Sequence, residues 1–306
     1  VTSIGNSAFD GCTGLTSVTI PDRVTSIDWY AFSGCTGLTT VNWNATACTS
    51  AGSYNYPIFK GCSNLATVTI GDNVKIIPSY AFHGCTGLTN VTIGNSVTSI
   101  GSNAFSGCTG LTSVTIPDSV TSIGSNAFYD CTGLTSITIP DSVTSIDSSA
   151  FEGCTGLTRI TIPDSVTSIG ESAFDGCTGL TSVTIGKGVT SIGSYAFDGC
   201  SEITSISGSS DVISKVAKQA SPKSFVGNIT SGTSVMADAF SGMTGLKGVT
   251  IPDSVTSIGE RAFYECTGLT SVTIGKGVTS IGDWTFFGCY RLIEVYNKST
   301  LSITAG

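Results

Sequence analysis

The amino-acid sequence predicts a repeat solenoid of about twelve coils, each about 23 residues long. Phenylalanine recurs at a fixed spacing, and a cysteine follows almost every one of these phenylalanines three residues later. The spaced phenylalanines are Phe9, Phe32, Phe59, Phe82, Phe105, Phe128, Phe151, Phe174, Phe197, Phe240, Phe263 and Phe286. A fixed period in the twenties is typical of chains whose repeats stack and share one apolar core. We therefore expect one elongated domain over residues 1–306.

The repeat is clearest over residues 111–133, where each segment has its own composition. Residues 111–116 alternate apolar and polar side chains, which predicts a short β-strand with one buried face. The Pro-Asp-Ser sequence at 117–119 predicts a turn. Val120 and Ile123 form a second apolar pair, and Gly124 permits a bend. Residues 125–128 are expected to form one short helical turn before the chain returns to the next strand.

Two places break the period, and we interpret both as insertions. The spacing between Cys35 and Cys62 is 27 residues, with the extra residues near 44–57. The spacing between Cys200 and Met243 is 43 residues, with the extra residues near 209–228. In this second segment, residues 211–220 place apolar side chains on one face at helical spacing. The sequence therefore predicts a short helix against the edge of the solenoid.

The cysteines predict a column of buried thiols. Eleven of them occupy one repeat position, so they should stack about 4.8 Å apart with parallel side chains. Disulfides need Cβ atoms about 3.8 Å apart that point toward each other. We therefore expect reduced thiols that pack as small apolar groups. Cys48 lies outside the column and is the candidate for a reactive or pairing thiol.

The composition excludes several classes of function. The net charge is −8 without a basic stripe, which disfavours nucleic acid as a partner. No apolar run approaches the ~18 residues of a membrane helix, so no membrane insertion is expected. His83 is the only histidine, and no Gly-x-Ser-x-Gly motif is present, so no nucleophile–base pair is predicted. We expect no enzyme activity, no metal site and no cofactor.

The pattern LxxVxIPxxVxxIGxxAFxxCxx resembles the leucine-rich repeats of the BspA-like (Treponema pallidum type) family over nearly the whole chain. The resemblance implies a right-handed superhelix with a parallel sheet on its concave side and short helical turns opposite. It also implies an extracellular or cell-surface location and a role in adhesion or ligand capture. No signal peptide is visible. Because Val1 and Ile4 fit the middle of a repeat, we expect the chain to be a fragment of a longer protein.

Candidate binding residues form two groups. One is a hydroxyl array on the solvent face of the strands, made by Ser113, Thr115, Ser136, Thr138, Thr161, Ser182 and Thr184 and interrupted by Arg159. Strand propensity alone also selects threonine on a wet strand face, so this array has two explanations. The other group comprises aromatic residues in and beside the first insertion, Trp43, Tyr54 and Tyr56, because interface energy concentrates on aromatic side chains.

The sequence as a whole predicts a secreted or cell-surface recognition module that binds a protein or glycan partner. The alternative is a structural spacer that projects another domain. A weaker possibility is binding of ice or another crystal surface by the threonine array.

Overall fold

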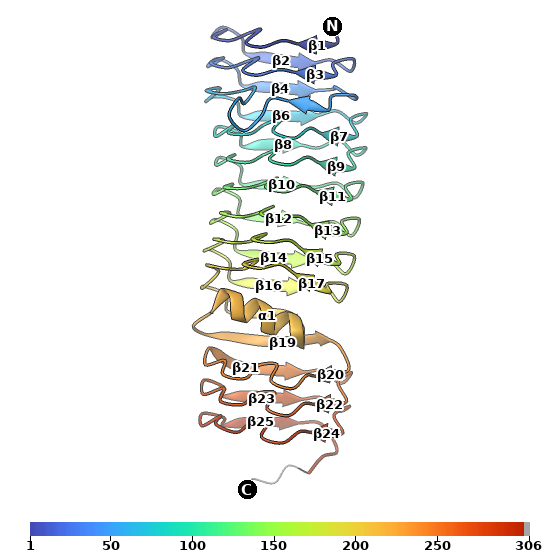
Figure 1. Cartoon of the computed structure of the whole chain (residues 1–306), viewed down its shortest axis with the longest axis vertical. Helices are drawn as coiled ribbons and strands as arrows, with labels where there is room; N and C mark the ends of the chain where they lie inside the picture. The colour runs from blue at the N-terminus through green and yellow to red at the C-terminus, as the bar shows by residue number, and fades with distance from the viewer. Residues whose placement is uncertain (303–306) are drawn as a thin grey trace.

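The structure of the chain, a computed structural model, describes residues 1–302 as a parallel β-solenoid whose coils stack along one axis (Figure 1). The described residues contain thirteen longer strands: β2 (Ser17–Ile20), β4 (Thr40–Trp43), β6 (Thr67–Ile70), β8 (Asn90–Thr92), β10 (Ser113–Thr115), β12 (Ser136–Thr138), β14 (Arg159–Ile162), β16 (Ser182–Ile185), β18 (Ser205–Ser209), β19 (Phe225–Ser231), β21 (Leu246–Ile251), β23 (Ser271–Ile274) and β25 (Glu294–Asn297). The predicted solenoid is confirmed.

A second column consists of two-residue strands, which we call the short strands. They are β1 (Ser3–Ile4), β3 (Ser26–Ile27), β5 (Ser50–Ala51), β7 (Ile76–Ile77), β9 (Ser99–Ile100), β11 (Ser122–Ile123), β13 (Ser145–Ile146), β15 (Ser168–Ile169), β17 (Ser191–Ile192), β20 (Ser234–Val235), β22 (Ser257–Ile258) and β24 (Ser280–Ile281). In the coil that begins with β18, the helix α1 (Ser210–Ala220) takes the place of the short strand.

Neighbouring coils pair in parallel with an offset of one repeat. Val114 pairs with Ile137 of the next coil, and Thr115 pairs with Thr138. Val114 is buried and Thr115 is exposed, which is the predicted alternation of a strand with one buried face. The inner side chains therefore form apolar columns, and the outer ones form columns of serine and threonine.

The segment that precedes each phenylalanine is a run of turns rather than the expected helical turn. Asn126 has a φ of 57°, which is outside the right-handed helical region. Its N–H donates to Ser148 O at 3.0 Å, and the N–H of Phe128 donates to Ala150 O at 2.8 Å. Because these amides bond to the next coil, they are not available for bonds within a helix.

The phenylalanines stack on one another through the core, across from the longer strands. Ring centroids of stacked neighbours lie 5.1 to 5.9 Å apart, and Phe128 and Phe151 are parallel to within 1°. Aromatic pairs at this separation gain energy beyond the burial of their area. The stack stops at Phe197 and resumes at Phe240, on the two sides of α1.

Residues 209–228 complete a coil of the solenoid, which corrects the expectation of an insertion at its edge. β18 pairs with β19, and β19 pairs with β21, both in parallel. Figure 1 shows α1 between the levels of β17 and β20, where a short strand and a phenylalanine turn lie in other coils. The helix itself is confirmed, and its predicted apolar face is buried. The segment therefore adds a thirteenth coil to the core.

We expect Ile213→Ala to destabilise the solenoid by about 2 to 5 kcal/mol, since Ile213 is fully buried on α1. The measurement is a urea titration followed by circular dichroism. Lys215→Ala, an exposed position on the same helix, is the control and should change stability by less than about 0.5 kcal/mol. Equal effects of the two substitutions would show that α1 is not part of the core.

The cysteine column consists of buried thiols that carry hydrogen bonds between coils. Cys131 Sγ donates to Phe105 O at 3.2 Å, and Cys154 Sγ donates to Phe128 O at the same distance. All twelve cysteines are free, and the column is buried from Cys35 onward. Burial raises the pKa of the Cys131 thiol to about 12, so this thiol stays protonated. The predicted column of unpaired thiols is confirmed.

Cys12, Cys48 and Met243 each differ from the buried thiols of the column, and each has a structural reason. Cys12 is exposed because no coil precedes it among the described residues. Cys48 is buried, its Sγ donates to Ser50 O at 3.3 Å, and burial raises its pKa. The expectation that Cys48 is the reactive thiol is therefore wrong. Met243 replaces cysteine in the coil that follows the coil of α1. The coil of α1 has no phenylalanine turn, so a thiol at position 243 would lack the phenylalanine carbonyl that accepts from the other thiols of the column.

Thiol alkylation should separate Cys12 from the other eleven cysteines. With native protein and a short pulse of iodoacetamide, we expect mass spectrometry to find modification at Cys12 alone, because the thiolate is the nucleophile and the other thiols are buried. After denaturation without reductant, all twelve thiols should react. Several disulfides in the denatured sample would contradict the stacked arrangement.

Candidate functional site

The predicted hydroxyl array lies on the exposed side of the longer strands, and we call this surface the strand face. Ser113 pairs with Ser136, and Thr115 pairs with Thr138, all four exposed. In the neighbouring coils, Arg159 pairs with Ser182 and Thr161 pairs with Thr184, while the buried Ile160 pairs with Val183. The structure therefore brings the predicted residues into two adjacent columns, with Arg159 as the charged member of one.

Threonine hydroxyls in two other columns, those of Thr135 and of Thr121, form hydrogen bonds between neighbouring coils. Thr135 Oγ1 donates to Thr112 O at 3.1 Å, and Thr121 Oγ1 donates to Thr98 O at 3.2 Å. Comparable bonds recur along both threonine columns. The hydroxyl of Thr115, by contrast, makes no hydrogen bond to any residue within 1–302. The exposed Thr115 hydroxyl is therefore free to bind a ligand or water.

Trp43 does not belong to an exposed site, contrary to the sequence-based expectation. It is fully buried and occupies the inner position of β4 that isoleucine occupies in the neighbouring strands, since it pairs with Ile20 and Ile70. Its ring meets the ring of Phe82 edge-on, with centroids 5.5 Å apart. The indole is core because the strand alternation points it inward.

Tyr54 and Tyr56 are exposed and belong to a larger cluster. Tyr56 stacks on Trp29 with centroids 4.5 Å apart and meets Tyr30 edge-on at 5.6 Å. Tyr54 stacks on His83 at 5.0 Å. The N-terminal aromatic cluster consists of Trp29, Tyr30, Tyr54, Tyr56, Tyr80 and His83. Trp29, Tyr30, Tyr80 and His83 were not predicted as site residues, although the aromatic residues just before Phe32 replace the usual polar ones.

The enlarged loop of the first insertion explains why these rings meet. The loop folds back on itself, because Ser53 N and Tyr56 N each donate to the carbonyl of the other residue, at 3.2 and 3.1 Å. Tyr30 Oη donates to Asn55 O at 3.0 Å, which ties the loop to the preceding coil. Lys60 Nζ lies 5.0 Å from the Tyr30 ring centroid, within the range of a cation–π contact.

His83 serves this cluster as a ring rather than as a base. Burial lowers the pKa of His83, and a hydrogen bond between Nδ1 and Ser106 O at 3.2 Å opposes that shift. Tyr80 lies edge-on to the imidazole at 6.2 Å. Within residues 1–302, His83 makes no hydrogen bond to a serine, threonine or cysteine side chain. His83 therefore does not pair with a nucleophilic side chain among the described residues.

A second exposed cluster lies near the C-terminal end and was not predicted from the sequence. The C-terminal aromatic cluster consists of Arg261, Tyr264, Trp284 and Phe287, which line a cavity of about 350 Å³. Arg261 Cζ lies 4.8 Å from the Trp284 ring and 5.8 Å from the Tyr264 ring. Tyr264 and Phe287 stack at 5.4 Å. Trp284 and Phe287 lie in one repeat and Arg261 and Tyr264 in the repeat before it, and the sequence pattern did not indicate that they meet.

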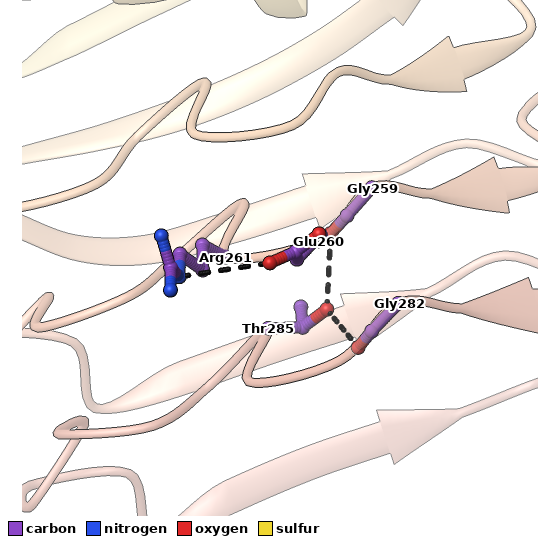
Figure 2. Close-up of polar contacts among 5 residues, drawn as sticks. All are labelled: Gly259, Glu260, Arg261, Gly282 and Thr285. Carbon is purple, nitrogen blue, oxygen red and sulfur yellow. Dashed lines mark hydrogen bonds and ion pairs between the residues drawn. The ribbon is translucent and has the colours of Figure 1, made fainter.

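Figure 2 shows the polar contacts of Thr285 and Arg261, next to the turn that carries Trp284. Thr285 replaces the usual alanine before phenylalanine, and its Oγ1 donates to Gly259 O at 3.0 Å and to Gly282 O at 2.7 Å. These bonds hold the turn that carries Trp284, whose φ is 54°. Arg261 Nε lies 3.7 Å from Glu260 Oε1, and both side chains are well exposed. A pair this exposed adds little stability.

Two further findings bear on the class of site. No three His, Cys, Asp or Glu side chains in the described part of the chain come together as a metal ion would require. In that same part, no helix has the length and apolarity needed to cross a membrane.

The chain is similar to leucine-rich repeat proteins of known structure. A leucine-rich repeat protein from Bacteroides ovatus is similar with a TM-score of 0.55 and 27% identity, over 96% of this chain and 82% of that one. The T. pallidum leucine-rich repeat protein has a TM-score of 0.45 and 27% identity, over 69% of this chain and 84% of that one. A leucine-rich cell-surface protein from Faecalibacterium prausnitzii has a TM-score of 0.38 and 27% identity, over 98% and 84%.

No curated protein matches the chain. The family described as "BspA type Leucine rich repeat region (6 copies)" matches residues 1–112, 55–177, 121–230 and 223–305. Because these matches together span nearly the whole sequence, the chain belongs to the BspA-type leucine-rich repeat family.

Proposed function

We propose that this chain is a non-enzymatic recognition module, secreted or displayed at the cell surface, that binds a protein or glycan partner through its exposed aromatic clusters. The observation that carries the proposal is the contrast between these clusters and the rest of the surface. Trp29, Tyr54, Trp284 and Phe287 are each about half or more exposed, while most other coils present serine and threonine. Exposed aromatic residues and arginine are the side chains that dominate interface energies.

Both aromatic clusters have the features of a binding surface. Their rings are already stacked, so little side-chain entropy is lost when a partner binds. Each cluster also holds a cation near a ring, Lys60 in one and Arg261 in the other. Stacked rings offer flat apolar surfaces to a sugar ring or an apolar side chain, and the cations add hydrogen-bond donors.

The strand face is the competing site. Its columns repeat the same hydroxyls from coil to coil, which suits weak contacts that gain strength by avidity. Arg159 and Glu294 are charged positions on this face. A repetitive glycan or an ice surface is the matching ligand, whereas a spacer would bind nothing.

The decisive experiment is a binding screen with a glycan array and purified host-matrix proteins. For a partner found in this way, we expect Trp29→Ala with Tyr54→Ala, or Trp284→Ala with Phe287→Ala, to weaken binding at least about tenfold. Tyr195→Ala removes an exposed tyrosine that lies outside both clusters and is the matched control. Circular dichroism should show unchanged folds.

The alternatives give different outcomes. Loss of binding in Thr115→Lys with Thr138→Lys, together with wild-type affinity in both aromatic variants, would place the site on the strand face. Thermal hysteresis in the unmodified chain would support binding to ice. A screen without any partner would favour the spacer, which has a reach of ~60 Å for thirteen coils at one strand spacing each.

A further inference from the structure

The short strands form three sheets, β1-β3-β5, β7 to β17 and β20-β22-β24. Between the second and the third sheet a whole coil lacks a short strand, and this leaves two strand edges facing each other. β17 belongs to the coil of β16, β20 belongs to the coil of β19, and the coil between them carries α1 instead of a short strand. β17 and β20 are therefore edge strands that lie two coils apart, or ~9.6 Å at ~4.8 Å per strand.

The edge of β17 presents unused hydrogen-bond acceptors. In the regular coils, Thr190 N donates to Thr167 O at 2.9 Å, and Gly193 N donates to Ile169 O at 2.8 Å. The next acceptors in these two columns are Thr190 O and Ile192 O. Among the described residues, no donor from the coil of α1 bonds to either carbonyl.

The edge of β20 presents the complementary donors. Here Thr256 N donates to Thr233 O, and Gly259 N donates to Val235 O, both at 2.8 Å. The preceding donors in these columns are Thr233 N and Met236 N, which make no hydrogen bond to any residue of the described chain. The acceptors that they would use belong to the short strand that is missing from the coil of α1.

Helix α1 compensates for the missing turn but not for the missing strand. Gln219 Nε2 donates to Gly193 O at 2.8 Å, and Gln219 Oε1 accepts from Phe197 N at 3.2 Å. On the other side of the helix, Ser214 Oγ donates to Ala239 O. These side chains replace backbone groups of a regular turn. No side chain of α1 bonds in this way to Thr190 O, Ile192 O, Thr233 N or Met236 N.

A cavity of about 680 Å³ lies between the two edges. Its apolar lining includes Val189 and Ile192, which are 7% and 8% exposed, whereas their counterparts Val166 and Ile169 are 0% and 1% exposed. Four charged side chains surround the cavity and sum to zero: Asp211, Lys215, Lys218 and Asp238. Recognition there depends on backbone bonds and apolar contact rather than on net charge.

We propose that the cavity between β17 and β20, the strand gap, binds an extended segment of a partner polypeptide as an added parallel strand. The segment donates N–H groups to Thr190 O and Ile192 O and accepts from Thr233 N and Met236 N. It places β-branched side chains on the apolar lining. Strand addition gives affinity through main-chain bonds and selectivity through alternate side chains. This site is separate from both aromatic clusters.

The probe for the test is a fluorescein-labelled peptide with the sequence DSVTSIDS, which is residues 141–148 of this chain and includes β13. It has the composition of the strand that the gap lacks. We expect saturable binding in fluorescence anisotropy below about 1 mM. Amide hydrogen exchange should slow at Thr233 and Met236 when the peptide is bound.

Three comparisons make the test specific. Met236→Pro removes a donor that no described residue uses and should weaken binding about three- to tenfold, whereas Met236→Leu, which keeps the N–H, should bind nearly as the parent does. A peptide N-methylated at alternate amides should lose binding even if Met236→Pro fails to fold. Deletion of residues 209–228 restores the 23-residue spacing between Cys200 and Met243. It brings β17 next to β20 and should abolish binding.

Equal affinity of the N-methylated and parent peptides would overturn the proposal, and so would a lack of binding up to about 1 mM. Protection that appears at the terminal strands β1 or β24, rather than at Thr233 and Met236, would also overturn it. Loss of the aromatic clusters by substitution should leave peptide binding unchanged, so the two proposals fail independently.

Discussion

Raising the pH from 8.5 to 10 is expected to reduce the free energy of unfolding by several kcal/mol. Burial raises the pKa of Cys131 to about 12 and raises the pKa values of Cys108, Cys154 and Cys177 well above their usual range. A thiol in an unfolded chain titrates near 8.5. The folded state therefore holds protons that the unfolded state releases. The stabilisation is complete below about pH 8.5 and is lost as the pH rises toward the folded pKa.

The size of this effect follows from the number of buried thiols. Each contributes up to about 1.4 kcal/mol per pH unit, and about half of that at pH 8.5, where the unfolded thiol is half deprotonated, so these four thiols together account for roughly 6 to 7 kcal/mol between pH 8.5 and 10. Urea titrations at several pH values measure the slope. A variant with these four cysteines replaced by alanine should lose the share of the slope that these four contribute, because alanine does not titrate. The seven other buried cysteines, whose pKa values burial also raises, should keep their share. An unchanged slope in that variant would assign the alkaline sensitivity to other groups.

Phe151→Ala is expected to destabilise the solenoid by about 3 to 5 kcal/mol. Phe151 is fully buried, and its ring stacks on Phe128 at 5.5 Å and on Phe174 at 5.3 Å. The substitution leaves a cavity in the middle of the stack, and the coils on both sides cannot close it without breaking their own backbone pairing. Urea titration of the variant measures the loss.

Phe9→Ala is the matched control for the phenylalanine stack. Phe9 occupies the same repeat position but is 41% exposed and stacks on one side only, against Phe32. Its removal should cost less than half as much as removal of Phe151. A cost for Phe151→Ala well below 1 kcal/mol would contradict its place in the core.

The sequence was sufficient to predict the repeat, the strand alternation and the thiol column. These features follow from local periodicity: Val114 and Thr115 point to opposite sides because a strand has a period of two. The cysteines are recognisable as a column because one repeat position maps to one place in every coil. The same periodicity led to the family resemblance, and the family matches bear it out.

Only the tertiary structure decided where the distinctive residues lie. Trp43 attracted notice as a rare aromatic residue, yet its place in β4 buries it. Trp284 and Arg261 are one repeat apart in sequence and become neighbours only through stacking. Residues 209–228 disturb the period, so the sequence suggested an insertion.

The physical reason for this division is the range of the interactions involved. Strand alternation and turn chemistry act within a few residues, so the sequence by itself determined the repeated coil. The clusters and the strand gap arise where side chains and edges from different coils meet, and a local pattern carries no information about such meetings. The thirteenth coil shows this most clearly, because α1 is predictable from its own residues, whereas its place in the stack depends on the pairing of β18, β19 and β21.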